Sequence, residues 1–505
     1  MMYFSGGFRL CLIIFSISMR MSPFNLVQLV RSLSRISAGF AALLLALVLA
    51  PITHAADTVE GEILVKLRSP AALPLIIAAY PGTISTQFGS RPIYRLKLPA
   101  GTDVGTTVTS LRGNADVLLV EPNTTQQSPE ARKNQPWAVG SASDYLPQWA
   151  PTAMRLALAH TFSKGAGVKV AVLDTGVDPA HPALAGKLLP GYDFVDNDTV
   201  PSEVGTTANL GYGHGTHVAG LIALAAPQAK ILPYRVLDLN GEGNAWVLAE
   251  AVQRAIDDGA HIINLSLGTA IKSDVLTSIA KLVSCEPPDE TDPVLNFSDP
   301  GYAADKARCA GGPGLVIIAA AGNDGSSSVK EYPAAVSAYG LLSVGASRQS
   351  GQLATFSNSG SWVQVAAPGE GITSAVPLAA TASGYAVWSG TSMAAPLAAG
   401  VAALLRSLEA DLPAKDLVRR IARTASPLIG TNIKQVDAAA LVERCNMDID
   451  GDGFVHATTD GLMLIRSMMG MTGAAVSSAA AAGSPRSDWP TIRQFLVNIC
   501  GMTLP

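Results

Sequence analysis

The stretch Val168-Lys169-Val170-Ala171-Val172-Leu173-Asp174-Thr175-Gly176 carries the strongest indication of the fold. A short β-branched run that ends in an acid and a glycine is typical of a buried strand, with the acid at its carboxyl end. Leu315-Val316-Ile317-Ile318-Ala319-Ala320-Ala321 repeats the pattern before Gly322-Asn323-Asp324-Gly325. The two runs predict an α/β fold, a doubly wound and mostly parallel sheet with helices on both faces and its site along the carboxyl edge.

A third stretch, Gly390-Thr391-Ser392-Met393-Ala394-Ala395-Pro396, leads into a helix that is apolar nearly all round. Such a helix is expected to be buried, and Pro396 is tolerated because it falls early. Ser392 lies in the first turn, where free backbone N–H groups and the positive end of the helix dipole suit a nucleophile whose attack creates an oxyanion. An ordinary N-capping serine is the alternative.

The stretch Gly213-His214-Gly215-Thr216-His217-Val218-Ala219-Gly220 puts a histidine between glycines and then starts a helix of small residues. Taken alone, Asp174 could begin a turn, and His214 could be a buried histidine at a helix start. An Asp, a His and a Ser that all lie at glycine-flanked ends of elements are much less expected by accident.

These pieces resemble the motifs of the subtilases, the subtilisin-type serine proteases, in which the chain order is Asp, His, Ser. The resemblance spans roughly residues 148–426. It implies that Ser392 is the nucleophile, that His214 accepts its proton and returns it to the leaving amine, and that Asp174 orients the imidazole. His217 is expected to pack near the site.

The same resemblance makes Asn323 the side-chain donor of an oxyanion hole, alongside the backbone N–H of Ser392. The alternative is a plain Asn-Asp-Gly turn.

Substrate contacts follow from the resemblance too, because three segments match those that line the cleft of the family. The residues expected to contact substrate are Gly241 and Gly243 on an edge segment, and Ser266, Leu267, Gly268, Ala320, Ala321 and Gly322 around the first specificity pocket. A pocket of small residues with no evident acid predicts an apolar or mixed preference for the residue before the cleaved bond.

Residues 57–133 resemble the small α+β propeptide of subtilases, because residues 61–67 and 94–98 alternate like strands. The resemblance implies an intramolecular inhibitor that assists folding; an ordinary N-terminal domain is the alternative. A polar linker, residues 124–135, follows, and self-cleavage is expected within it. The catalytic domain is expected over residues 134–430.

The first 56 residues predict a leader. Two arginines precede ten apolar residues, 41–50, which are too few to span about 30 Å of hydrocarbon. We expect a signal peptide that is cleaved near Ala55 or Ala56, secretion to the extracellular space or periplasm, and no stable membrane anchor.

Composition agrees with a compact secreted hydrolase. Of 505 residues, 15% are charged and 48% are hydrophobic, which argues against disorder. A net charge of −4 gives no reason to expect a nucleic-acid partner.

The cysteines indicate an oxidising compartment. Cys285 and Cys309 bracket a loop rich in Pro, Asp and Gly, and Cys445 and Cys500 bracket the C-terminal segment. We expect these two pairs to be disulfides, with free buried thiols as the alternative.

The C-terminal segment, residues 440–505, contains Asp448-Ile449-Asp450-Gly451-Asp452-Gly453, which fits the opening of an EF-hand calcium loop. It resembles a single dockerin-type repeat, a small helical module that Asp460 could close. The closing acid is one residue late and is Asp rather than Glu, and no second loop follows. The predicted Ca²⁺ ligands are Asp448, Asp450, Asp452 and Asp460, against the alternative of a solvated acidic turn. A cohesin-type partner is not expected.

Two functions remain open at this point. The first is a secreted serine endopeptidase that cuts protein or peptide substrates through an acyl-enzyme and is made as a self-processing precursor. The second is a subtilase fold retained as a binding module. An α/β-hydrolase esterase would need a Gly-x-Ser-x-Gly elbow, which the segment around Ser392 lacks.

Overall fold

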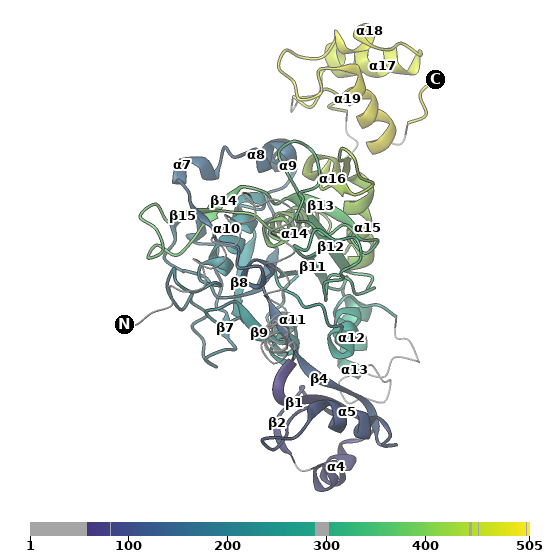
Figure 1. Ribbon diagram of the computed structural model, residues 1–505. Helices are drawn as coiled ribbons and strands as arrows, with labels where there is room; N and C mark the ends of the chain where they lie inside the picture. The colour runs from purple at the N-terminus through teal and green to yellow at the C-terminus, as the bar shows by residue number, and fades with distance from the viewer. Residues whose placement is uncertain (1–57, 81, 288–301, 444–446, 453, 501) are drawn as a thin grey trace, which may run out of the picture. The chain divides into compact units, whose positions relative to one another are not determined.

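The computed structural model describes residues 58–80, 82–287, 302–443, 447–452, 454–500 and 502–505 (Figure 1). The chain divides into a unit of residues 1–56 and a unit of residues 57–505. The expected signal peptide, with its cleavage near Ala55 or Ala56, lies outside the described residues.

A nine-stranded sheet forms the centre of the second unit. Its order is β16 (Ser426–Pro427), β17 (Lys434–Gln435), β13 (Val365–Pro368), β12 (Leu341–Ser347), β11 (Val316–Ala320), β10 (Ile262–Leu265), β6 (Lys169–Asp174), β8 (Lys230–Arg235) and β7 (Tyr192–Asp193). Every pairing is parallel except that of β16 with β17. The predicted strands at 168–173 and 315–321 are β6 and β11, so the predicted fold class is confirmed.

Alternate residues of one strand reach two different cores. In β6, Val170 and Val172 pack with residues of α10 (His214–Ala225) and α14 (Thr391–Leu408). Ala171 and Leu173 pack with α11 (Ala245–Asp257) and α12 (Asp274–Val283) on the other face (Figure 1). A strand covered on both faces must be apolar throughout, which is why the run lacks polar alternation.

Helix α14 is buried over nearly its whole length. All its residues from Thr391 to Arg406 are buried, and Pro396 lies inside it. Among the described residues it alone has the length and hydropathy of a membrane span, but 89% of it is covered by the protein itself. It is therefore a core helix that brings Ser392 to the carboxyl edge of the sheet.

The N-terminal part forms a five-stranded antiparallel sheet, with order β2 (Thr83–Gln87), β3 (Ile93–Lys97), β1 (Thr58–Leu67), β4 (Val117–Gln127) and β9 (Glu242–Asn244). Helices α4 (Leu73–Ala79) and α5 (Val104–Arg112) accompany it, and it has a small core of its own. The predicted strands at 61–67 and 94–98 correspond to β1 and β3.

The expected linker is more ordered than its composition indicates. Strand β4 continues to Gln127 and adds to β9, and α6 (Pro129–Arg132) follows at once. Pairing with an edge strand uses main-chain hydrogen bonds, which polar sequences make as well as apolar ones. A search for hydrophobic periodicity therefore misses this strand.

The remaining elements connect these parts. They are η1 (Pro70–Ala72), β5 (Ala138–Val139), α7 (Ala142–Tyr145), α8 (Trp149–Ala153), α9 (Leu156–Phe162), η2 (Pro182–Leu184), α13 (Tyr302–Gly311), β14 (Ile372–Ala375), β15 (Tyr385–Trp388), α15 (Ala414–Thr424) and α16 (Ala438–Val442). Strands β14, β15 and β5 form a separate antiparallel sheet.

The C-terminal segment is helical. It contains η3 (Ala457–Gly461), α17 (Leu462–Met468), α18 (Ala474–Ser477), α19 (Trp489–Gln494) and η4 (Phe495–Ile499). A separate cluster holds it together, formed by Ile449, Met463, Val476, Ile492, Phe495 and Leu496.

One predicted disulfide is present, between Cys285 and Cys309, with Cα atoms 5.3 Å apart. Cys500 is disulfide-bonded, but its predicted partner Cys445 lies outside the described residues.

Candidate active site

Asp174 ends β6 and His214 begins α10, so both lie at the carboxyl edge of the sheet. The Nδ1 atom of His214 is 2.7 Å from Oδ1 of Asp174, and both side chains are buried. Gly215 permits this approach, because a Cβ there would lie 2.2 Å from the carbonyl oxygen of Gly176. Gly215 is thus needed for space, whereas Gly213 adopts a φ of 90°, which favours glycine.

The hydroxyl of Ser392 lies in the same site, but it meets a carboxylate that the sequence did not single out. Its Oγ donates to Oε2 of Glu130 over 2.6 Å and lies 3.2 Å from the carbonyl oxygen of Ser266. Nε2 of His214 is 3.1 Å from the same Glu130 oxygen. Among these described side chains no hydrogen bond joins His214 to Ser392 directly; the Glu130 carboxylate bridges them.

The second oxygen of Glu130 is held by Asn323, which follows β11. Nδ2 of Asn323 donates to Oε1 of Glu130 over 2.8 Å. The amide is oriented by Thr391, whose backbone N–H and Oγ1 both donate to Oδ1 of Asn323 at 2.9 Å. Thr391 is a positioning residue that the sequence analysis missed, although it stands next to Ser392.

Gly390 keeps room for this oxygen. A Cβ at Gly390 would lie 1.7 Å from Oε1 of Glu130 and 3.1 Å from Nδ2 of Asn323. The site therefore contains a cradle for an anionic oxygen in front of Asn323.

The charges of the site are strongly coupled. Burial lowers the pKa of His214, but the carboxylates of Asp174 and Glu130 outweigh burial and raise that pKa to about 10. Burial raises the pKa of Glu130, yet its contacts with His214, Ser392 and Asn323 leave it below its ordinary value. The pair is therefore an imidazolium and a carboxylate at neutral pH, and an imidazolium cannot accept a proton from Ser392.

A second buried carboxylate, Glu203, holds the start of α10. It accepts hydrogen bonds from the backbone N–H groups of Gly213 and Thr216, and from the hydroxyl of Thr175, which follows Asp174. Burial raises the pKa of Glu203 to about 7. Nothing in the local sequence pattern marks this residue.

The rings around His214 keep water away from it. Trp388 packs edge-on against His214 and His217, with ring centroids 5.4 and 5.7 Å apart. Burial, together with the positive charge of His214, lowers the pKa of His217 to about 3, so His217 is neutral. It packs beside the site, as the sequence analysis expects.

The end of β4 lies on the predicted edge segment. Gln126 pairs with Gly243 in an antiparallel register, and the N–H of Ser128 donates to the carbonyl of Gly241 over 3.1 Å. The chain therefore occupies this edge as an added strand.

The other predicted wall contacts the same strand. Gln127 and Gly268 exchange two backbone hydrogen bonds of 3.0 and 2.9 Å. Ser266 donates its hydroxyl to the carbonyl of Ser392 over 2.9 Å, while Leu267 is buried in the core behind.

The third predicted segment, residues 320–322, is expected to form the opposite wall of the predicted pocket. Ala320 and Ala321 are buried, and the N–H of Gly322 donates to Oγ1 of Thr391 over 3.1 Å. Gly322 thus contacts Thr391, the residue that orients the amide of Asn323.

Residues 128–133, here called the plug, make two further contacts that the sequence did not indicate. Arg132 forms a 2.7 Å ion pair with Glu331, whose side chain is buried. Lys133 forms a 2.5 Å ion pair with Asp324. The plug thus binds the rest of the chain through two ion pairs, with Glu331 and with Asp324.

Three of the four residues predicted to bind calcium have their carboxylates close together. Carboxylate oxygens of Asp448, Asp450 and Asp460 lie within 4.8 Å of one another. Asp452 is outside this group, and its Oδ1 accepts the backbone N–H of Phe454 instead. Oxygen-only donors suit Ca²⁺ rather than a softer metal.

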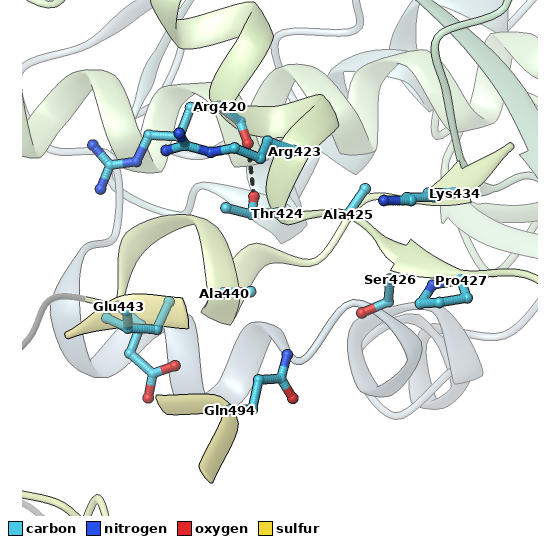
Figure 2. Close-up of a pocket in the computed structure, with 11 residues that line it drawn as sticks. Arg420, Arg423, Thr424, Ala425, Ser426, Pro427, Lys434, Ala440, Glu443 and Gln494 are labelled. Atoms are coloured by element: carbon cyan, nitrogen blue, oxygen red, sulfur yellow. Dashed lines mark hydrogen bonds between the residues drawn. The ribbon is translucent and has the colours of Figure 1, made fainter. Parts of the chain in front are cut away.

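A separate groove of about 630 Å³ shares no lining residue with the active site (Figure 2). It is lined by Arg420, Arg423, Thr424, Ala425, Ser426, Pro427, Lys434, Ala440, Glu443, Gln494 and Ile499.

Comparison with known proteins defines the class and then the family. The chain is a serine endopeptidase, and it belongs to the subtilase family, whose model matches residues 165–448. A second model, that of the fervidolysin N-terminal prodomain, matches residues 50–123. The chain therefore carries the prodomain of a precursor that is processed.

Individual proteins that are similar to this chain agree with this assignment to the subtilase family. The chain is 38% identical over 316 residues to the thermophilic serine proteinase of Bacillus sp. (strain AK1), covering 60% of this chain and 67% of the relative. It is 37% identical over 294 residues to thermitase of Thermoactinomyces vulgaris, covering 56% and 90%. The crystal structure of fervidolysin from Fervidobacterium pennivorans, a keratinolytic enzyme related to subtilisin, matches with a TM-score of 0.60 and 24% identity over 77% of this chain and 62% of that chain. This structural likeness supports the fold alone.

Proposed function

We propose that the chain is secreted and becomes an active endopeptidase after it removes its own N-terminal part. The observation that carries this proposal is the Glu130 carboxylate, which contacts Ser392, His214 and Asn323 at once. A carboxylate in that place resembles the product of peptide cleavage, with one oxygen in the cradle and the other beside the hydroxyl. Hydrolysis of casein by the processed chain tests the proposal, and a processed, folded chain without that activity contradicts it.

The mechanism assigns a role to each side chain. Ser392 Oγ attacks the carbonyl carbon of the substrate, and its proton passes to Nε2 of a neutral His214. Asp174 orients the ring through the 2.7 Å contact at Nδ1 and stabilises the imidazolium. Asn323 Nδ2 and the backbone N–H of Ser392 stabilise the oxyanion. The imidazolium then protonates the leaving amine, and water hydrolyses the acyl-enzyme by the same steps in reverse order.

Glu130 blocks each of these steps in the precursor. It fills the space of the oxyanion, it engages the nucleophile, and it keeps His214 protonated. Inhibition by the prodomain is thus exerted through one side chain at the reacting groups, in addition to the occupied edge strand.

Replacing Glu130 with glutamine is expected to speed self-processing by roughly 10–100-fold at pH 7, because a charge-assisted hydrogen bond contributes about 1.5–3 kcal/mol. The pKa of His214 falls once the Glu130 charge is gone, so more of the imidazole is neutral. Conversion of refolded precursor is followed by mass spectrometry over time.

The pH dependence of self-processing distinguishes loss of the Glu130 charge from a general destabilisation of the prodomain. In the wild type, protonated His214 holds the Glu130 carboxylate at neutral pH. It loses its proton, and with it this contact, as the pH rises through its pKa of about 10. Glu130, with its lowered pKa, loses its charge only in acid. Processing of the wild type should therefore accelerate toward pH 10, and E130Q should lack that rise. The matched control is Glu60→Gln, an exposed acid on β1. Equal rates for E130Q and E60Q contradict the account.

The C-terminal segment, residues 440–505, is proposed to be a dockerin-like module stabilised by one Ca²⁺ between Asp448, Asp450 and Asp460. Bound Ca²⁺ would act there as a structural cross-link between the loop and the helix that follows it. The gathering of three buried or half-buried carboxylates supports this, because carboxylate oxygens are the ligands that Ca²⁺ prefers.

Calorimetry on the Ser392→Ala precursor should detect one Ca²⁺ site that Asp460→Asn removes. The exposed Asp488, which caps α19, serves as the control: Asp488→Asn should bind as the parent does. No heat of binding for the parent, with folding intact, contradicts the calcium assignment.

The domain limits proposed for the mature and precursor forms follow from these parts. Residues 57–133 are the inhibitory prodomain, 134–430 the catalytic domain and 440–505 the appended module. The small prodomain core and the separate C-terminal cluster support this division.

A further inference from the structure

Glu331 is a buried acid close to the predicted specificity pocket. Its Oε1 lies 2.6 Å from the position that a Cβ on Gly268 would take, and its Oε2 lies 3.2 Å from the corresponding position on Gly322. These two glycines belong to the two predicted walls. The carboxylate therefore occupies the space that the absent side chains leave between the walls.

The side chain that meets Glu331 in the precursor is an arginine. Nη2 of Arg132 is 2.7 Å from Oε2, whereas Oε1 of Glu331 has no donor among the described residues. Burial raises the pKa of Glu331, and the Arg132 guanidinium opposes that rise. A buried carboxylate without a cation is costly, so the site is built for a positive group.

Glu331 lies close to the place where the substrate bond is cut. Gly322 immediately precedes Asn323, and Gly268 lies two residues after Ser266, whose carbonyl is 3.2 Å from Ser392 Oγ. Gly268 also pairs with the strand that fills the cleft. A side chain that passes between these glycines must therefore come from a residue close to the attacked carbonyl.

We propose that Glu331 selects arginine, and lysine less well, as the residue that precedes the cleaved bond. The inference rests on the proposed peptidase function. Arginine is favoured because its planar fork can use both carboxylate oxygens, whereas an ammonium is a point charge. This replaces the expectation of an apolar or mixed preference, which followed from the small residues of the walls. Arg132 in the plug then acts as an internal mimic of the substrate side chain.

The alternative is that Arg132 and Glu331 only clamp the plug in the precursor. After processing, a mere clamp would give no preference for a cationic side chain. The two readings therefore differ in the mature enzyme, where Arg132 no longer competes for the carboxylate.

The test uses processed enzyme and peptides that differ only in the residue before the bond: Arg, Lys, Phe, Leu or Glu. Active sites are counted by titration with a serine-directed phosphonate. For the wild type we expect kcat/KM for Arg to exceed that for Phe by roughly 10²–10³-fold, since a buried charge pair contributes on this scale. In Glu331→Gln the Arg-to-Phe ratio should fall by a similar factor. Equal ratios in the two enzymes overturn the proposal.

A second measurement needs no variant and covers the case in which E331Q fails to mature. Benzamidine, a flat cation, should inhibit the wild type competitively, while the uncharged benzamide should not. Titratable enzyme that cleaves Phe and Arg peptides alike and ignores benzamidine refutes the specificity proposal alone. A folded, processed chain that neither titrates nor cleaves any peptide refutes the peptidase function itself.

Discussion

Replacing Ser392 with alanine is expected to lower kcat by roughly 10⁶-fold and to leave the precursor uncut, because the hydroxyl is the atom that forms the acyl-enzyme. Stability should change little, since Ala is a good helix former in the first turn of a buried helix. The precursor is purified under denaturing conditions, refolded and followed by mass spectrometry for the loss of its N-terminal part.

Ser407→Ala is the matched control for this variant. Ser407 lies on the same helix, and its hydroxyl donates to the carbonyl of Ala166 over 2.7 Å, away from the site. It should process like the wild type. Self-cleavage of purified Ser392→Ala precursor at the wild-type rate would show that another group performs the reaction.

Replacing Asn323 with alanine is expected to lower kcat by about 10²–10³-fold while KM changes little, because the amide stabilises charge that develops only in the transition state. The loss of kcat should be large because the amide is already oriented. Thr391 holds it so that Nδ2 faces the cradle at Gly390. Kinetics are measured on processed enzyme with titrated active sites.

The exposed Asn432 provides the comparison for that loss. Asn432→Ala should keep wild-type kcat. If Asn323→Ala retains activity within about threefold of the wild type, the cradle is not the oxyanion hole, and the position of the Glu130 oxygen has another meaning.

The parts that sequence analysis predicts well are those with a local cause. The run before Asp174 is apolar because both faces of β6 are covered, and Gly215 stands beside His214 because a Cβ there would collide with the carbonyl oxygen of Gly176. Each residue of the proposed triad stands at the end of such an element. Their meeting follows from the parallel arrangement of the sheet.

The residues that escape prediction act over long distances in the chain. Glu130 meets a histidine 84 residues away and a serine 262 residues away, and it stands in a polar segment that resembles a linker. Glu331 stands in a loop, where an acid normally faces solvent. Its burial depends on Gly322 in the same loop region and on Gly268, which is remote in sequence, so the acid in the pocket could not be found from local patterns.

The acidic loop at residues 448–460 is an intermediate case. The carboxylates of Asp448, Asp450 and Asp460 lie together, and their role as Ca²⁺ ligands stays a prediction. Asp452 instead caps the next turn of the backbone. Alternation of acids predicts the loop, but it does not decide which carboxylate turns inward.

Labelling with a serine-directed phosphonate tests the central claim most directly, namely that the hydroxyl at position 392 is activated by His214 and Asp174 once Glu130 has left. Processed wild-type protein should take up one phosphonate per chain, and peptide mapping should place it on Ser392, while unprocessed precursor at pH 7 reacts much more slowly. An adduct on a different serine, or a folded and processed chain that does not react, would contradict the account.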